Sequence, residues 1–405
     1  MPPGHFVFLP CRAWQYRAVT GSSRNSGLSR QELWLRRRLR IGLLLCCVVS
    51  ARLGMAEPDR TKQVDAIFQS LKSRDLPGAA VLVIENGHVV FQRGYGVTDL
   101  RTHRPIDGRT DFRLASVTKQ FTAMAIMLLV HDGKLRYESR LTDIFPDFPD
   151  YGREITIRQL LNHTSGLKDY EDLMPKDYQS GSRELRQIKD PEVLELLKRE
   201  KTTNFPPGTK WAYSNSGYVL LGMVVERVLG KPFGQFLHDR IFMPLKMRGS
   251  IAYEKGKKEV PNRAYGHSRE PDGWHETDQS PTSATLGDGG VYSSVEDLDQ
   301  WDTALREHTL LSPAEMEPAL TPVRLPQGQL TQPDGSPAEY GFGWFLNPYN
   351  GHRRMWHYGE TLGFRTAIQR FVDDRLTVIV LCNRSDLDAS ALALKVADVY
   401  VAGTR

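Results

Sequence analysis

Apolar residues near the two ends of the chain follow the spacings of helices and strands. Residues 59–73 carry apolar side chains at intervals of three to four, which predicts an amphipathic helix. Two strand-like runs follow at residues 79–84 and 89–96, and they flank Asn86-Gly87, the dipeptide that most favours a two-residue hairpin turn. Near the other end, the pattern predicts strands at residues 340–345, 364–372 and 375–382 and a last helix that Asp386 caps and that ends at Val401.

The middle of the chain has a helical pattern. The run Ala123–Val130 is apolar on every helical face, so we expect a helix buried in a core, and its eight residues are too few to cross a membrane. From residue 156 to residue 306 the chain is predicted to be mainly helices and loops, most clearly at residues 190–197 and 218–229. Strands at both ends with helices between them predict an α/β (α+β) fold, in which one antiparallel sheet is built from both chain ends and flanked by helices.

This pattern also predicts the domain organisation. We expect residues 57–405 to form a single domain. Its α/β lobe would comprise about residues 57–130 and 320–405, and an inserted, mainly helical lobe would comprise about residues 131–319.

Charge is distributed unevenly along the chain. Residues 1–56 hold nine arginines and one glutamate, a formal charge of +8, so the total of +5 leaves −3 for the remainder. A basic surface for nucleic acid is therefore not supported. A signal peptide is predicted by the arginines at 36–38 and 40, an apolar stretch at 41–49 and a small-x-small site ending at Ala56. The length of the leader around it suggests a misassigned start. We expect export to the periplasm or medium, with no stable membrane span after cleavage; an uncleaved anchor is the alternative.

The strongest candidate for chemistry lies just before the buried helix. Ser116 stands at a position where helix N-caps favour serine, and Lys119 lies one turn further on the same face. A hydroxyl at the positive end of a helix dipole beside an amine can act as a nucleophile. The alternative is a helix cap with a solvated lysine, but a helix without an exposed face requires a specific partner for Lys119.

Three further segments concentrate polar and aromatic side chains. Tyr213-Ser214-Asn215 precedes a helix, so its tyrosine and amide can face one cavity. Trp356-His357-Tyr358-Gly359-Glu360 precedes a strand, and its glycine permits close approach to an edge-strand backbone. The polar turn within residues 160–167 is assigned a structural role between the two lobes.

Together these segments resemble the serine β-lactamase-like hydrolases, the group of class C β-lactamases, D-alanyl-D-alanine carboxypeptidases and related esterases. The resemblance extends from the Asn86-Gly87 hairpin to the final helix and includes His163-Thr164-Ser165-Gly166 and Gly289-Gly290-Val291-Tyr292-Ser293. It implies a β-lactamase/transpeptidase-like fold with Ser116 as nucleophile, Lys119 as the residue that tunes it, and Tyr213 as general base or proton relay. A tyrosine with an ordinary pKa of ~10 needs nearby cations to act as a base near neutrality.

The resemblance also implies substrate-binding residues. Asn215 would contact the substrate carbonyl, and the backbone N–H groups of Ser116 and Glu360, the latter following Gly359, would hold the oxyanion. At the position of His357, β-lactamases of this group more often carry lysine, whereas carboxypeptidases and esterases often carry histidine. Because histidine is mostly neutral at pH 7, anionic β-lactams are expected to be poor substrates.

The sequence therefore predicts an exported serine hydrolase that acts through an acyl-enzyme on an ester or a D-amino-acid peptide. Peptidoglycan is one source of such a peptide. A β-lactamase is one alternative, and a non-catalytic protein that binds peptidoglycan or antibiotics is another. The sequence contains no Gly-x-Ser-x-Gly of α/β-hydrolases and no His-Glu-x-x-His of zinc enzymes, and no cofactor or metal is expected. The oligomeric state stays open, and the substrate depends on loops at residues 168–186 and 254–281.

Overall fold

The computed structural model describes residues 59–175, 178, 186–325, 330–331 and 337–401. The signal peptide expected within residues 1–56 lies outside these residues. Within the described part of the chain, no helix combines the length and the apolar character needed to cross a membrane.

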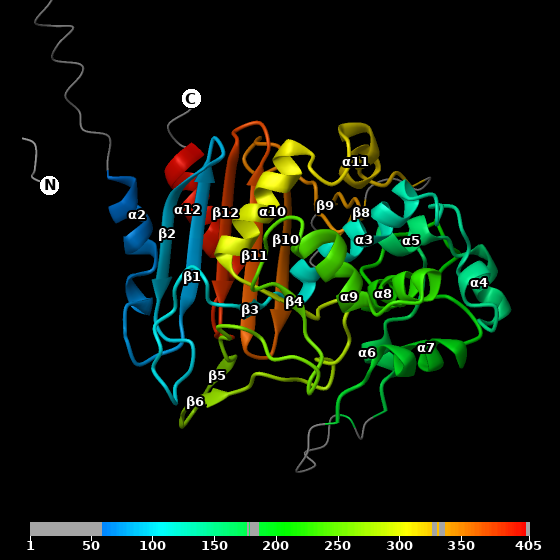
Figure 1. Ribbon diagram of the computed structural model, residues 1–405, viewed down its shortest axis with the longest axis horizontal. Helices are drawn as coiled ribbons and strands as arrows, with labels where there is room; N and C mark the ends of the chain where they lie inside the picture. Colours follow the sequence, from blue (N-terminus) through cyan, green and yellow to red (C-terminus); the bar gives the residue numbers. More distant parts are fainter. Residues whose placement is uncertain (1–58, 176–177, 179–185, 326–329, 332–336, 402–405) are drawn as a thin grey trace, which may run out of the picture. The chain divides into compact units, whose positions relative to one another are not determined.

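The main sheet joins the two ends of the chain. Its five antiparallel strands have the order β10-β11-β12-β1-β2 (Figure 1). They are β1 (Ala79–Glu85), β2 (His88–Tyr95), β10 (Arg354–Thr361), β11 (Phe364–Phe371) and β12 (Leu376–Cys382). β1 pairs along its whole length with β12, so the prediction of one antiparallel sheet built from both ends is confirmed. Asn86 and Gly87 form the expected turn, with φ values of 54° and 82°.

Successive side chains of β1 face two different cores. Val81 packs in the core that contains helices α2 (Arg60–Ile67) and α12 (Ala389–Val401), whereas Leu82 belongs to the larger core around helix α3 (Lys119–His131). Because neighbouring side chains of a strand point to opposite faces, helices must cover both faces of this sheet. This arrangement explains why all of β1 except Glu85 is buried.

Between the hairpins the chain is mainly helical, as expected. The helices are α3, α4 (Leu141–Ile144), α5 (Ile157–Leu161), α6 (Tyr170–Leu173), α7 (Asp190–Lys198), α8 (Asn215–Leu229), α9 (Phe233–Leu237), α10 (Val295–Glu307) and α11 (Pro313–Leu320). Shorter helical turns are η1 (Gln69–Leu71), η2 (Ala115–Thr118), η3 (Asp150–Glu154) and η5 (His238–Phe242). A three-stranded sheet has the order β3 (Phe112–Arg113), β7 (Val291–Ser293), β4 (Ile251–Ala252). Two-stranded sheets are formed by β5 (His267–Glu270) with β6 (Gly273–Glu276) and by β8 (Leu330–Thr331) with β9 (Pro337–Ala338). Every residue of α3 from Lys119 to Leu129 is buried, which confirms the prediction from the apolar run.

The strand expected at residues 340–345 does not form. Tyr340 and Phe345 instead face each other across a tight turn, in which Gly343 has a φ of 76°. A Cβ atom on Gly343 would lie 2.7 Å from the Lys119 carbonyl oxygen, so the turn packs directly against the start of α3. The strand in this region is β10, which begins at Arg354.

The last helix begins later than its predicted cap. α12 starts at Ala389, and the Asp388 carboxylate accepts a hydrogen bond of 2.8 Å from the backbone N–H of Ala391. Asp386 pairs with the Arg384 guanidinium at 2.7 Å. The prediction that Asp386 caps the helix is therefore wrong, because a charge-assisted pair with a neighbouring arginine engages its carboxylate.

Candidate active site

Ser116 lies in the short turn η2, which continues directly into α3. The N-cap of η2 is Leu114, and no side chain caps it, so the expected N-cap role of Ser116 is wrong. The serine is one residue inside the turn, where its hydroxyl accepts a hydrogen bond from Lys119. Ala115, immediately before it, has a φ of 47°, a left-handed conformation that costs a non-glycine residue on the order of 1–3 kcal/mol. Such strain is typical of functional sites.

Lys119 is completely buried and has three acceptors for its ammonium group. Its Nζ lies 3.0 Å from Ser116 Oγ, 2.8 Å from Asn215 Oδ1 and 3.0 Å from the Asp288 carbonyl oxygen. Burial lowers the pKa of Lys119 to about 8, although the carboxylates of Asp288, Asp169 and Glu171 oppose this shift. The expectation of a specific partner for Lys119 is confirmed, and a substantial fraction of the amine is neutral near pH 8.

Tyr213 is half-buried beside this pair. Lys119 Nζ lies 4.9 Å from the centroid of its ring, so the cation contacts the ring face. Burial raises the pKa of Tyr213 above its ordinary value, and the neighbouring Ser116 hydroxyl only reduces the rise. The phenol is therefore protonated at neutral pH, and the stabilisation of a phenolate by nearby cations stays a prediction.

The turn His163-Thr164-Ser165-Gly166 holds the loop that carries Tyr213. The His163 carbonyl accepts from the Ala212 N–H at 3.0 Å, and His163 Nδ1 accepts from the Ser214 N–H at 3.2 Å. The His163 ring also packs on the Tyr213 ring, with centroids 4.3 Å apart. These contacts fix the backbone on both sides of Tyr213. They support the structural role assigned to this turn.

Carboxylates that the sequence analysis did not single out surround Lys119 and Asn215. Asp169 Oδ2 accepts from the Asn215 backbone N–H at 2.7 Å, and Glu171 Oε1 accepts from Asn215 Nδ2 at 3.2 Å. Desolvation, followed by the charges of Asp169 and Asp288, raises the pKa of Glu171 to about 7. In the sequence, these carboxylates were marked only by their position in, or near, a loop expected to shape the substrate site.

Strand β10 passes directly over the serine turn. A Cβ atom at Gly359 would lie 2.1 Å from the Leu114 carbonyl oxygen and 2.9 Å from the Ser116 backbone nitrogen. Only glycine permits this approach. It brings the backbone at Gly359 and Glu360 beside the N–H of Ser116, while the Glu360 side chain is exposed.

His357 lies behind the site rather than at its surface. Its Nδ1 donates to the Tyr358 carbonyl at 2.7 Å, which leaves Nε2 to accept from the Tyr340 hydroxyl at 3.1 Å. Burial and the Lys119 charge lower the pKa of His357 to about 3. The ring is therefore neutral, as expected, but both of its nitrogens bond within the protein.

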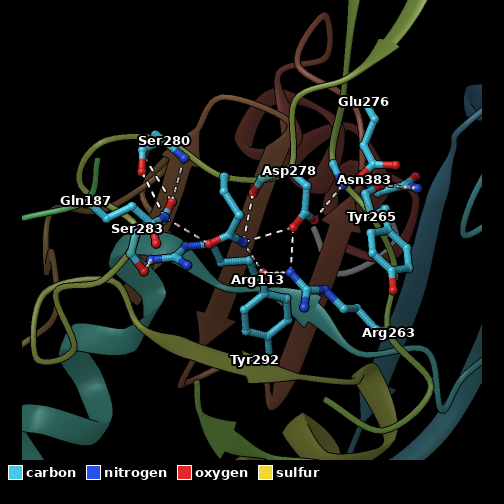
Figure 2. A network of polar contacts seen from close by, with 12 residues as sticks. Arg113, Gln187, Arg263, Tyr265, Glu276, Asp278, Ser280, Ser283, Tyr292 and Asn383 are labelled. Atoms are coloured by element: carbon cyan, nitrogen blue, oxygen red, sulfur yellow. Dashed lines mark hydrogen bonds and ion pairs between the residues drawn. The ribbon is translucent and has the colours of Figure 1, made fainter. Parts of the chain in front are cut away.

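A buried polar network supports the strand that leads into the serine turn. Arg113, three residues before Ser116, donates to the Ser283 carbonyl at 3.1 Å. Arg263 forms an ion pair with Asp278 and donates to the Tyr292 hydroxyl, and Figure 2 shows these side chains converging. The network joins β3 and β7 to residues 263–283, much of the second loop expected to shape the substrate site.

Comparisons with known proteins agree with this arrangement. A family model described as Beta-lactamase matches residues 64–401. Penicillin-binding protein 4* of Bacillus subtilis (strain 168) is 33% identical over 360 residues, which cover 85% of this chain and 77% of that protein. A D-aminopeptidase of Cereibacter sphaeroides is 29% identical over 322 residues, which cover 78% of this chain and 58% of that protein, so the chain spans less than two thirds of it.

Solved structures show the same fold. The octameric penicillin-binding protein homologue from Pyrococcus abyssi has a TM-score of 0.72 at 25% identity, covering 85% of this chain and 78% of that chain. D-amino acid amidase from Ochrobactrum anthropi SV3 has a TM-score of 0.71 at 25% identity, covering 86% of this chain and all of that chain. The family model spans most of the chain and includes the serine turn. Together with these relatives, it shows that this protein belongs to the beta-lactamase family and is a serine hydrolase.

Proposed function

We propose that the protein hydrolyses an ester or the amide bond of a D-amino-acid peptide through an acyl-enzyme on Ser116. The observation that carries this proposal is the buried Lys119, whose Nζ lies 3.0 Å from Ser116 Oγ and whose pKa burial lowers to about 8. A neutral amine at hydrogen-bond distance from a serine hydroxyl is a competent base for it.

In the proposed reaction, Ser116 Oγ attacks the substrate carbonyl carbon while its proton passes to Lys119 Nζ. The backbone N–H groups of Ser116 and Glu360 stabilise the oxyanion, which fits the close approach of β10 at Gly359. Tyr213, protonated because burial raises its pKa, donates its proton to the leaving group and regains one from Lys119. Water then attacks the acyl-enzyme by the reverse route and regenerates Ser116.

This assignment predicts the pH dependence of the reaction. Since Lys119 must be neutral to accept the proton, kcat/KM for an uncharged aryl ester is expected to rise with pH and to level off above about 8. An ordinary lysine would place the rise near ~10.4. Burial keeps His163 and His357 neutral through this range, so neither produces the rise. A profile that falls above pH 8 would show that Lys119 acts as a cation, and Lys119→Arg, which keeps only the charge, serves as the control.

The carboxylates beside Asn215 favour a substrate with a free amino group. Asp169 and Glu171 both accept hydrogen bonds from Asn215, and Asn215 Oδ1 accepts from Lys119 Nζ, so their negative charge lies beside the residue expected to contact the substrate. A substrate ammonium would pair with them, whereas a carboxylate would be repelled. Arg354 lies six residues along β10 from Glu360, roughly 20 Å away, so it does not offset this charge. Arg365 lies opposite Glu360 on β11, where its guanidinium donates to the Thr361 and Phe364 carbonyls. The names D-aminopeptidase and D-amino acid amidase among the similar proteins fit this preference.

Glu171→Gln is expected to raise KM about tenfold for D-alanine p-nitroanilide at pH 8, because a charge-assisted hydrogen bond to the ammonium is lost. KM for a neutral aryl ester should not change. The matched control is Asp172→Asn, which removes the neighbouring exposed acid on the same helix α6. Equal hydrolysis of the N-acetylated anilide by the parent enzyme would contradict the proposed ammonium site. A cephalosporin cleaved faster than ester and anilide would instead identify a β-lactamase.

We further propose that the leader within residues 1–56 directs export and that the remaining chain forms the two-lobed domain described by the sequence pattern. Export would place the enzyme in the periplasm or the medium, where peptidoglycan supplies D-amino-acid peptides. A non-catalytic binding protein is the weaker alternative, since Ser116, Lys119 and Tyr213 are all present and adjacent.

A further inference from the structure

A cavity lies at the end of the main sheet opposite the serine. It has a volume of about 690 Å³ and is enclosed by the β1–β2 turn, the β11–β12 turn, the C-terminal end of α10 and the segment before β10. Along β10, the distance from Arg354 at this cavity to Glu360 at the serine spans six residues, roughly 20 Å. None of Ser116, Lys119, Tyr213 or Asn215 lines it.

The cavity combines an apolar interior with a cationic edge. Its apolar lining includes Ile84, Leu305, Leu346, Met355, Phe371 and Leu376. Leu320 and Val372, which are 38% and 44% exposed, extend this apolar surface to the solvent. Five arginines line the cavity against two acids, Asp302 and Glu339, although the chain after residue 56 has a formal charge of −3. The positive charge is therefore a local feature.

Most of these arginines already have partners. Arg306 and Arg370 pair with Asp302 at 3.0 and 2.7 Å, and Arg353 pairs with Asp373 at 2.7 Å. Arg354 donates to Gln369 Oε1 at 2.8 Å. Arg375 is different: its guanidinium forms no hydrogen bond or ion pair with any residue in the described ranges, and it is exposed.

The backbone at Arg375 is nevertheless well held. Its carbonyl accepts from the Asn86 N–H at 2.9 Å, and its own N–H donates to the Val372 carbonyl at 3.3 Å. With a φ of 52° it has the left-handed conformation, which disfavours arginine by roughly 1–2 kcal/mol. A cationic side chain thus projects from a strained but fixed position where two hairpin turns meet, beside an apolar cavity.

We propose that this cavity binds a small amphipathic carboxylate, with its hydrocarbon part on the apolar lining and its carboxylate on Arg375. The volume falls within the range of roughly 300–1,000 Å³ that is usual for small-molecule sites. A guanidinium binds a carboxylate through two parallel hydrogen bonds, and Arg375 is the lining arginine whose guanidinium forms no ion pair or hydrogen bond within the described residues. The site is independent of the proposed hydrolysis at Ser116.

Isothermal titration of the full chain with octanoate tests the proposal. Ser116 is first blocked with a fluorophosphonate, so that binding in the hydrolytic site does not contribute. We expect one octanoate per chain, with much weaker binding of octylammonium, which has the wrong charge, and of acetate, which has no chain. Arg375→Asn is expected to weaken octanoate binding about tenfold, the effect of losing one charged hydrogen-bonding partner. Asparagine tolerates the left-handed conformation, so this variant retains the turn.

The matched control is Arg248→Asn, which removes an exposed arginine that does not line the cavity. It should bind octanoate as the parent does, and both variants should keep the parent's ester hydrolysis. The proposal is overturned if the blocked enzyme no longer binds octanoate, if octylammonium binds equally well, or if the two arginine variants behave alike.

Discussion

Ser116→Ala is expected to abolish covalent labelling by a fluorophosphonate and to lower ester hydrolysis by at least about 10⁴-fold, the scale at which removal of a nucleophile acts in serine hydrolases. The reason is that Ser116 has Lys119 Nζ at 3.0 Å, within a strained turn at the start of a buried helix. Intact-mass measurement should show one adduct on the parent enzyme and none on the variant.

The matched control for this experiment is Ser165→Ala. Ser165 is buried in the turn that holds the Tyr213 loop, where its hydroxyl accepts from the Leu167 N–H at 3.3 Å. Its replacement should leave the adduct in place. Labelling of Ser116→Ala equal to that of the parent, or an adduct that maps to Ser165 or Ser214, would contradict the assignment of the nucleophile.

Tyr213→Phe is expected to fold normally and to lower turnover of a D-amino-acid anilide by about a hundredfold or more, the usual contribution of a positioned proton donor. Burial keeps the Tyr213 phenol protonated, which suits it to protonate an amine that leaves. A p-nitrophenyl ester has a leaving group that needs no proton, so its hydrolysis should fall much less. Paired measurements of kcat on the two substrates distinguish a proton donor from a base for Ser116.

Equal losses on ester and anilide would move Tyr213 to the role of base. Unchanged activity on both substrates would remove it from the mechanism. Tyr349→Phe is the matched control, since it also removes a phenol, one that donates to Asp398 at 3.1 Å far along the chain from the serine turn. This variant should retain the parent's ratio of ester to anilide turnover.

Much of the fold follows from local pattern. Asn86 and Gly87 adopt the left-handed turn that these two residue types favour, and the strands on each side pair as their composition predicts. The apolar run of α3 has no polar face, so burial was its only favourable environment. The spacing of Ser116 and Lys119 places both on one face of a helical turn, and this alone predicts their contact.

Other features depended on residues far apart in the sequence. The segment from Tyr340 to Phe345 has the composition of a strand, yet it turns at Gly343 because its aromatic rings bury against His357 and His163. Asp386 is a suitable helix cap by sequence, but the neighbouring Arg384 engages its carboxylate. In both cases a tertiary or charged contact outweighed a local preference of about 1 kcal/mol.

The features of the serine site also fall into two groups, those that the sequence predicts and those that depend on the tertiary structure. The sequence by itself determined the nucleophile candidate, its lysine, the tyrosine loop and the glycine of the edge strand, because each depends on residue type and short spacing. Only the tertiary structure brought Asp169, Glu171 and Asp288 around Lys119, and only it buried His357. Protonation depends on solvent exclusion and on charges from distant segments, and no local pattern of residues encodes either.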